Sequence, residues 1–210
     1  MFNVVTIARE CGSGGTEIGR LVAKTLGWEL LDRKIIERVA AMGNVDCNWA
    51  EEMDEQSCAW WERVLDGFRH GGPEVYVGGV ADEGVDRDEL QRFTARVIEE
   101  AARMGNCVII GRGSQCVLRN ESQALHVLVY APLAEKLERM KYQYPRERDF
   151  EKLLRDMDAG RVHYVKHYFG SDSKDPKLYH LCLNSTLGLD ACAELIVEIV
   201  RSYARERRVA

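Results

Sequence analysis

A glycine-rich segment at residues 9–16 has the residue types that bind phosphate. It reads Arg-Glu-Cys-Gly-Ser-Gly-Gly-Thr, and it lies between the β-branched run 3–8 and a stretch whose apolar residues recur at helical spacing. Glycine lets backbone N–H groups turn inward without Cβ clashes, and the start of a helix adds positive potential. A strand, a glycine loop and a helix in this order predict a polyphosphate-binding loop. The alternative is a glycine turn that binds no ligand.

This loop departs from the usual phosphate-loop pattern GxxxxGK[ST]. Arg9 occupies the place of the first glycine and Gly15 that of the lysine, whereas Thr16 keeps the hydroxyl group that would reach Mg²⁺. Loss of the lysine removes a positive charge from the β- and γ-phosphates. The sequence offers Arg9 as the nearest replacement and Arg20, one turn into the helix, as the second. The predicted phosphate-binding residues are Gly12, Ser13, Gly14, Gly15, Thr16 and Arg20.

A second candidate group lies on the helix expected at residues 149–169. Arg155, Asp158 and Arg161 are spaced i, i+3 and i+6, so they share one face, with Tyr164 and Tyr168 nearby. The planar guanidinium group binds phosphate oxygens in pairs, and a closing lid could place such groups over a transferring phosphoryl group. With Arg9, these three residues form the predicted catalytic set. The alternative is an ordinary ladder of ion pairs on a solvated helix.

Two polar residues stand at the ends of predicted strands. Arg112 follows the apolar run 106–111, and open α/β sheets bind their ligands at the carboxyl ends of strands. A surface arginine in a loop is the alternative. Asp32 ends the strand expected at 28–32, where it would bind an acceptor or Mg²⁺, or would cap the following helix.

The elements that must position these residues alternate between strands and helices. This alternation predicts an α/β fold with a mostly parallel sheet. We expect strands at 3–8, 28–32, 106–111, 124–131 and 178–184, and helices at 16–26, 34–42, 87–104, 132–142, 149–169 and from 190 onward.

The segment 44–90 differs in composition from the rest of the chain. It has thirteen Asp or Glu residues against three Lys or Arg, and it contains Trp49, Trp60 and Trp61. We interpret it as an inserted helical subregion. A solvated acidic face is the expected role, with a partner-binding surface as the alternative.

Composition narrows the functional classes. A chain of 210 residues fits one domain, and its net charge of −5 argues against nucleic acid or an anionic membrane as the main partner. The seven cysteines are scattered without a CxxC pair, which is typical of reduced thiols. The N-terminus lacks a basic signal-peptide region, and no apolar run approaches a membrane span. We therefore expect a cytoplasmic protein without a membrane partner.

The segment TIARECGSGGTEIGRLVAKTLGWELLD (6–32) resembles the opening of the cytidylate kinase-like proteins of bacteria, in which an Arg-Glu pair precedes a GSGG loop. The resemblance continues in VIIGRGSQCVL (108–118), RDMDAGR (155–161) and LYHLCLNSTLGLDACAELI (178–196). It covers nearly the whole chain except the acidic segment.

This resemblance implies a P-loop kinase fold, a five-stranded parallel sheet flanked by helices. The single domain would span 1–210, with a helical monophosphate-binding insert at 33–95 and a lid at 143–178. The resemblance also implies ATP with Mg²⁺ as donor and a nucleoside monophosphate, CMP or dCMP, as acceptor. The partners would thus be small-molecule nucleotides and not nucleic acid, and the chain would be a monomer or homodimer.

The acceptor residues also follow from the resemblance. Cytidylate kinases have an aspartate at the end of the second strand and an arginine six residues later, where this chain has Asp32 and Arg38. They have Gly-Arg-Asp where this chain has Gly-Arg112-Gly113, so the arginine carries over and the aspartate does not.

This chain thus differs from the usual kinase patterns at two residues, and each difference leaves an alternative function open. The missing aspartate allows a kinase for another small acceptor, and the missing lysine allows a nucleotide-binding module without turnover. A third alternative is an interaction protein that uses the acidic segment.

Overall fold

The computed structural model describes residues 1–32 and 87–206 of the chain. Arg38, most of the predicted monophosphate-binding insert and nearly all of the acidic segment lie outside the described residues, so those expectations stay predictions.

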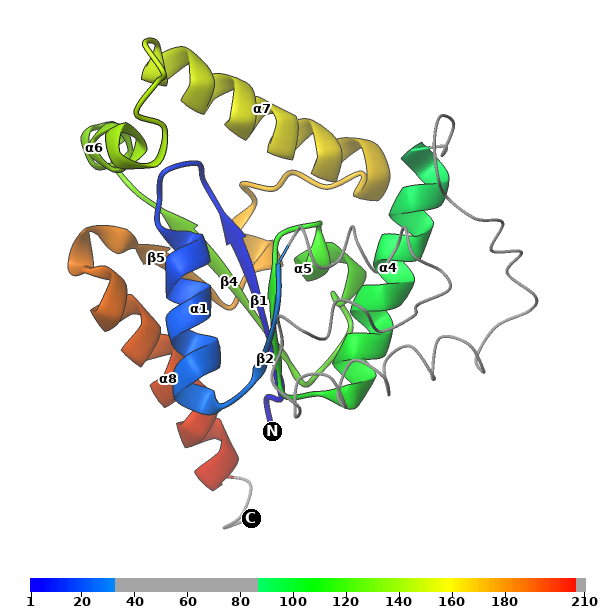
Figure 1. Cartoon of the computed structure of the whole chain (residues 1–210). Coiled ribbons are helices and arrows are strands. Elements are labelled where there is room, and N and C mark those ends of the chain that lie inside the picture. The colour runs from blue at the N-terminus through cyan, green and yellow to red at the C-terminus, as the bar shows by residue number, and fades with distance from the viewer. Residues whose placement is uncertain (33–86, 207–210) are drawn as a thin grey trace, which may run out of the picture.

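A five-stranded, fully parallel sheet forms the centre of the described structure, which confirms the predicted fold class (Figure 1). The strand order is β2-β3-β1-β4-β5, and β1 pairs with β3 through Val5 and Val108. The phosphate loop therefore follows the central strand. The strands are β1 (Val4–Arg9), β2 (Glu29–Leu31), β3 (Cys107–Ile110), β4 (Ala124–Tyr130) and β5 (Leu181–Asn184).

The last strand is shorter than the sequence pattern predicts. It begins at Leu181 instead of residue 178, because Pro176–Leu178 form a 3-10 turn. The carboxylate of Asp175 accepts a hydrogen bond from the N–H of Lys177 and caps this turn. The proline supplies the first φ angle of the turn and no amide donor, so the strand starts after it.

Helices cover both faces of the sheet (Figure 1). α1 (Gly15–Leu26) and α8 (Leu189–Glu206) cover one face, and α4 (Arg87–Met104) with the short α5 (Ser114–Val117) covers the other. Gly27 ends α1 in a left-handed conformation, and its N–H donates to the carbonyls of Ala23 and Lys24. The helix therefore ends at Leu26, where the predicted helix at 16–26 ends.

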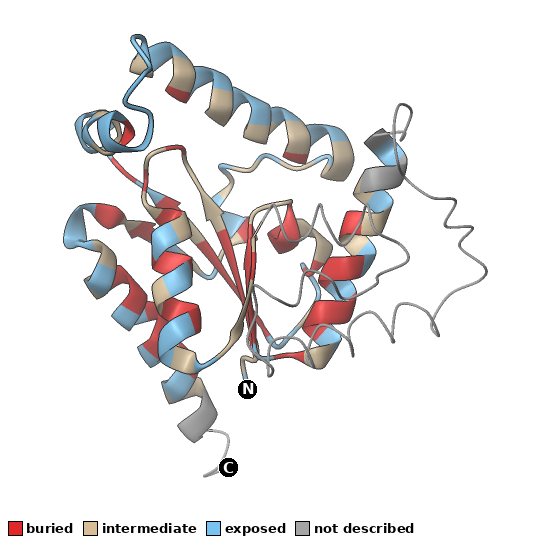
Figure 2. Ribbon diagram, viewed as in Figure 1, coloured by how far each residue is buried: buried red, intermediate tan, exposed pale blue. Residues whose placement is uncertain are grey.

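Two apolar cores lie between the sheet and these helices, as the buried residues in Figure 2 show. The core under α1 and α8 includes Ile7, Ile18 and Ile196, and the core under α4 includes Ile98 and Ile109, all fully buried. Because both faces of the central strands are covered, those strands are apolar almost throughout.

α6 (Leu133–Gln143) and α7 (Phe150–Phe169) lie beyond the carboxyl ends of the strands, outside both cores (Figure 1). Only Leu154 and Val165 of the twenty residues of α7 are buried. A small third cluster joins Leu154 to Met140 of α6 and Cys11 of the loop. α7 is therefore attached by little apolar surface, which is compatible with its predicted place in a lid at 143–178.

All five cysteines of the described residues are free thiols. Within the same residues, no helix combines the length and the apolar character that crossing a membrane requires.

Candidate active site

The glycine loop has the conformation expected of an anion-binding turn. Gly12 and Gly14 have φ angles of +71° and +80°, in the left-handed region that favours glycine. Gly14 is the N-cap of α1 and has no side chain to cover the helix start. A Cβ at Gly12 would lie 2.9 Å from the carbonyl oxygen of Lys136, so the loop packs directly against α6.

Arg9 and Gly15 depend on each other. A Cβ at position 15 would lie 2.6 Å from the Cβ of Arg9, closer than two carbon atoms can approach. A lysine at 15 therefore needs a glycine-sized residue at 9, as in the usual pattern. The guanidinium group of Arg9 extends over Gly111 at the end of β3, where an added Cβ would meet its Nη1. Its charge thus lies on the β3 side of the loop.

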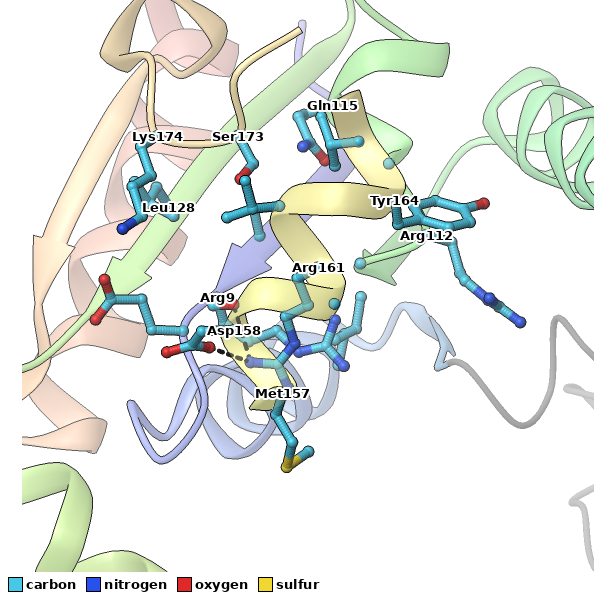
Figure 3. A pocket seen from close by; sticks show the side chains of 18 of the residues that line it. Arg9, Arg112, Gln115, Leu128, Met157, Asp158, Arg161, Tyr164, Ser173 and Lys174 are labelled. Atoms are coloured by element: carbon cyan, nitrogen blue, oxygen red, sulfur yellow. Dashed lines mark hydrogen bonds and ion pairs between the residues drawn. The ribbon is translucent and has the colours of Figure 1, made fainter. Parts of the chain in front are cut away.

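Four charged side chains surround the loop, and we call them the loop cluster: Glu10, Lys136, Asp158 and Arg161. Lys136 Nζ lies 3.0 Å from Glu10 Oε2 and 3.3 Å from Asp158 Oδ2. Arg161 Nη1 donates to Asp158 Oδ1 at 3.1 Å and to the carbonyl of Arg9 at 3.3 Å. Figure 3 shows Asp158 and Arg161 pointing from α7 toward Arg9.

The carboxylate of Asp158 also binds the loop backbone. The N–H of Cys11 donates to Asp158 Oδ1 at 2.6 Å. One carboxylate therefore accepts from a loop amide, an ammonium group and a guanidinium group at once. Three converging donors of this kind form an anion site.

The ionisation of Lys136 and Cys11 follows from their surroundings. Burial alone would lower the pKa of Lys136, but the hydrogen bonds and charges of Glu10 and Asp158 outweigh it and raise that pKa. The ammonium group is therefore charged. Burial raises the pKa of the Cys11 thiol, which lies 3.3 Å from the sulfur of Met157. A neutral, enclosed thiol is a weak nucleophile.

The structure does not bring all the predicted cations together. Arg155 is 70% exposed, and its Nη1 lies 3.8 Å from Glu151 Oε2. Arg20 is 55% exposed and pairs with Glu17 at 3.4 Å, one turn along α1. Asp158 and Arg161 therefore face the loop, whereas Arg155 and Arg20 face solvent.

Sequence reasoning missed two cations of α6, Lys136 and Arg139. Arg139 Nη1 donates to the carbonyl of Gly12 at 3.3 Å and to Ser185 Oγ at 2.8 Å, and so joins α6, the loop and the end of β5. The sequence did contain a signal for these two cations. β4 ends at the same sheet edge as the loop, so residues three apart in the next helix share a face near it.

A cavity of about 490 Å³ lies between α7 and the carboxyl ends of β1, β3 and β4, within the usual range for small-molecule sites. Arg9, Arg112 and Arg161 line it (Figure 3). A second cavity, of about 760 Å³, lies on the α6 side of α7 and is lined by Lys136 and Arg155. Both cavities include Glu10 and Asp158, so they meet at the loop cluster.

The turn after β3 forms the wall of the first cavity opposite the loop. Gly111, Arg112 and Gly113 have φ angles of +74°, +57° and +68°, three left-handed residues in a row. A Cβ at Gly113 would collide with the ring of Phe169 at the end of α7. The guanidinium carbon of Arg112 lies 5.9 Å from the ring centre of Tyr164, and Figure 3 shows this side chain pointing away from Arg161.

Gln115 follows this turn and lines the same cavity while being only 2% exposed. Its Nε2 lies 3.4 Å from the hydroxyl of Tyr179, which donates to the carbonyl of Ser173 at 2.7 Å. Burial raises the pKa of Tyr179, so that hydroxyl keeps its proton. Gln115 Oε1 is buried without a hydrogen-bond partner among the described residues.

The sequence profile of the cytidylate kinase-like family matches residues 4–187. This chain belongs to the cytidylate kinase-like family. The family and the fold make it a member of a kinase group that in general uses ATP and Mg²⁺.

Known relatives support this membership over part of their length. The family member described here is 32% identical over 95 residues to the cytidylate kinases of Bordetella pertussis (strain Tohama I) and Bordetella bronchiseptica (strain RB50). The matched segment covers 45% of this chain and 42% of each relative, less than half of their length.

Solved structures are similar in fold. An uncharacterized protein from Eubacterium ventriosum superposes with a TM-score of 0.71 at 16% identity, over 96% of this chain and 99% of that one. Shikimate kinase from Acinetobacter baumannii superposes with a TM-score of 0.51 at 17% identity, over 97% and 95% of the two chains. The fold of the cytidylate kinase-like chain is therefore that of P-loop kinases.

This family member departs from the usual patterns at Gly15, in place of a lysine, and at Gly113, in place of an aspartate. At each position a neighbouring side chain leaves room only for glycine. Arg9 excludes a side chain at Gly15, and Phe169 excludes one at Gly113. The remaining predicted acceptor residue in the described structure, Asp32, follows β2 and is half-buried. β2 is the edge strand, and β3 separates it from the loop. Asp32 does not line the cavity of about 490 Å³.

Proposed function

We propose that this chain transfers a phosphoryl group from ATP to a nucleoside monophosphate, with CMP or dCMP as the acceptor. The observation that carries this proposal is the anion site at the loop. There a loop amide, Lys136 and Arg161 all donate to the carboxylate of Asp158, beside the N-terminus of α1. Phosphoryl transfer needs aligned phosphates and neutralised charge more than covalent help from the protein. This arrangement supplies both.

The donor phosphates fit the loop. The amides of residues 12–16 would hold the β-phosphate, and Arg161 would stabilise charge on the transferred group while Asp158 fixes its orientation. Thr16, the second residue of α1, is half-buried beside the loop. Its hydroxyl would share Mg²⁺ with phosphate oxygens and water, since this ion needs few protein ligands. Bound Mg²⁺ would neutralise charge on the phosphate oxygens.

The acceptor fits the first cavity. Arg9 would hold its phosphate, Arg112 would join it by turning toward the cavity, and Gln115 would recognise its base. Cytosine presents an N4 amine donor, which would suit the unpartnered Oε1 of Gln115 once the side chain turns that buried oxygen toward the cavity. Uracil presents a carbonyl oxygen at the same place and would leave that acceptor unsatisfied, at a cost in affinity.

α7 would close over both substrates as part of the lid at 143–178. It buries only two residues and carries Asp158 and Arg161 to the point where the two cavities meet. A lid of this kind excludes water, so that ATP is not hydrolysed before the acceptor binds.

The experiment is an assay of ADP release from ATP and Mg²⁺ with CMP, dCMP, UMP, AMP and shikimate as separate acceptors. We expect the highest kcat/KM with CMP or dCMP and the formation of CDP or dCDP. A better acceptor elsewhere in the panel would identify a different small-molecule kinase. ATP binding without ADP release for any acceptor would show a nucleotide-binding module without turnover.

A further inference from the structure

The loop lacks its lysine, yet a lysine ammonium group lies beside it. Lys136 comes from the first turn of α6 and has a side chain only 12% exposed. Its backbone contacts Gly12, so α6 cannot shift away from the loop without opening that packing. The charge is therefore held at the loop by the fold.

We infer that Lys136 replaces the missing loop lysine and binds the terminal phosphates of ATP, an inference that rests on the proposed function. In the free protein the carboxylate of Asp158 stands where these phosphate oxygens would bind. It accepts from the N–H of Cys11 at 2.6 Å and from Lys136 Nζ at 3.3 Å. A phosphate that displaced it would meet the same donors.

The packing at position 15 explains why a lysine does not fit in the loop itself. Arg9 blocks any side chain at position 15, because a Cβ there would lie 2.6 Å from its own Cβ. An arginine at 9 and a lysine at 15 are thus incompatible. Lys136 supplies the ammonium group from a different element, while Arg9 extends over Gly111 at the end of β3.

The displacement is also physically reasonable. α7 carries Asp158, buries only Leu154 and Val165, and packs Phe150, Leu153 and Met157 partly buried, so its movement opens one small apolar cluster and neither main core. When Asp158 leaves the loop, Lys136 keeps Glu10 as a partner at 3.0 Å, and Asp158 keeps Arg161 as a partner at 3.1 Å on the same helix. An ammonium group has three donors and can serve a carboxylate and a phosphate together.

The test is calorimetric titration of ATP into Lys136→Met, with Lys141→Met as the matched control. Lys141 lies in the same helix, is 54% exposed and, among the described residues, pairs only with Glu138 in the same turn. We expect Lys136→Met to raise the Kd of ATP about 10- to 100-fold, the range for one lost charge-assisted hydrogen bond. Lys141→Met should leave that Kd within about twofold.

A variant that returns a lysine to position 15 of the loop tests the inference further. Arg9→Gly with Gly15→Lys restores the usual loop, and in the Lys136→Met background it should recover most of the lost ATP affinity. If Lys136→Met does not fold, as judged by its unfolding midpoint without nucleotide, Lys136→Gln takes its place and should show the same loss.

Equal ATP affinity in wild type and Lys136→Met would overturn the inference while leaving the proposed function intact. Failure of the wild type itself to bind ATP would instead refute the proposed function. The wild-type titration therefore separates the two failures.

Discussion

The loop and the turn after β3 lie at the same edge of the sheet but prepare their sites by opposite means. Around the loop, charged side chains are paired with one another at 3.0 to 3.3 Å, and three donors converge on one carboxylate. At the turn, the backbone is held in three left-handed residues, and the cavity wall is made by the amide of Gln115 and the hydroxyl of Tyr179.

The loop is therefore suited to a general task, the binding of phosphate, and the turn to a specific one, the recognition of one base. Phosphate oxygens are the same in every nucleotide, and placed positive charge is enough to bind them. Distinguishing one base from another needs fixed hydrogen-bonding atoms in a shaped cavity. We therefore expect changes in the loop cluster to affect turnover with every acceptor, and changes at the turn to affect the choice of acceptor.

The largest effect is expected from Arg161→Lys. Lysine keeps the charge but loses the fork that contacts Asp158 and would contact the transferred phosphate. We predict that kcat falls about 1,000-fold, the lower range for losing an arginine at a phosphoryl-transfer site. Steady-state kinetics with ATP and CMP measures this.

The matched control is Arg148→Lys, because Arg148 is exposed in the segment between α6 and α7. It should leave kcat within about twofold. An equal loss in both variants would mean that kcat depends on guanidinium groups anywhere on the lid, and not on the position of Arg161.

The next effect tests whether acid sensitivity arises in the sheet interior, away from the loop and the turn. His126 of β4 is 4% exposed; its Nε2 donates to the carbonyl of Leu118, so its Nδ1 accepts from Thr6 Oγ1. Burial, followed by the nearby charge of His180, lowers its pKa to about 4 from an ordinary value near 6.5.

Between these values the unfolded chain binds a proton that the folded protein does not. The free energy of unfolding should therefore fall by up to about 3 kcal/mol as the pH drops from 7 to 4. Urea unfolding at several pH values checks this. His126→Asn should flatten the dependence, whereas His163→Asn, at an exposed position of α7, should not. A steep dependence retained in His126→Asn would show that a group other than His126 causes the acid sensitivity.

A smaller and more selective effect is expected at the turn. Gln115→Leu keeps the approximate volume but removes the buried Oε1, so we predict that KM for CMP rises about 10- to 100-fold while KM for ATP stays within about twofold. Kinetics with CMP and UMP measures both constants. If KM for ATP rises as much as KM for CMP, the turn also contributes to ATP binding, and the two regions do not have separate tasks.

The smallest effect is expected at Gly160, inside α7. A Cβ there meets no atom of the described residues within 4 Å, and alanine favours a helix over glycine by about 1 kcal/mol. Gly160→Ala should raise the thermal midpoint by about 2 to 4 °C, as followed by circular dichroism. An unchanged midpoint would indicate that α7 opens before the sheet unfolds, so that its stability does not contribute to the global transition.

The sequence predicted the loop and the sheet because both follow from local patterns. β-branched runs gave the strands, and the glycines between a strand and a helix gave the turn at Gly12 and Gly14. The role of Lys136 could not be read in this way. Its contact with Glu10 joins residues 126 positions apart, and only the packing of α6 on the loop brings them together. Likewise, the reason for Gly113 is the ring of Phe169, which lies on a different element.

The direct test of the account is a titration of the wild-type protein with AMP, ADP and ATP in the presence of Mg²⁺. If the loop and its surrounding cations hold a polyphosphate, affinity should rise at each step and be at least about tenfold higher for ATP than for AMP. Equal affinity for the three nucleotides, or no binding at millimolar concentration, would contradict the claim that this loop binds phosphate without its own lysine.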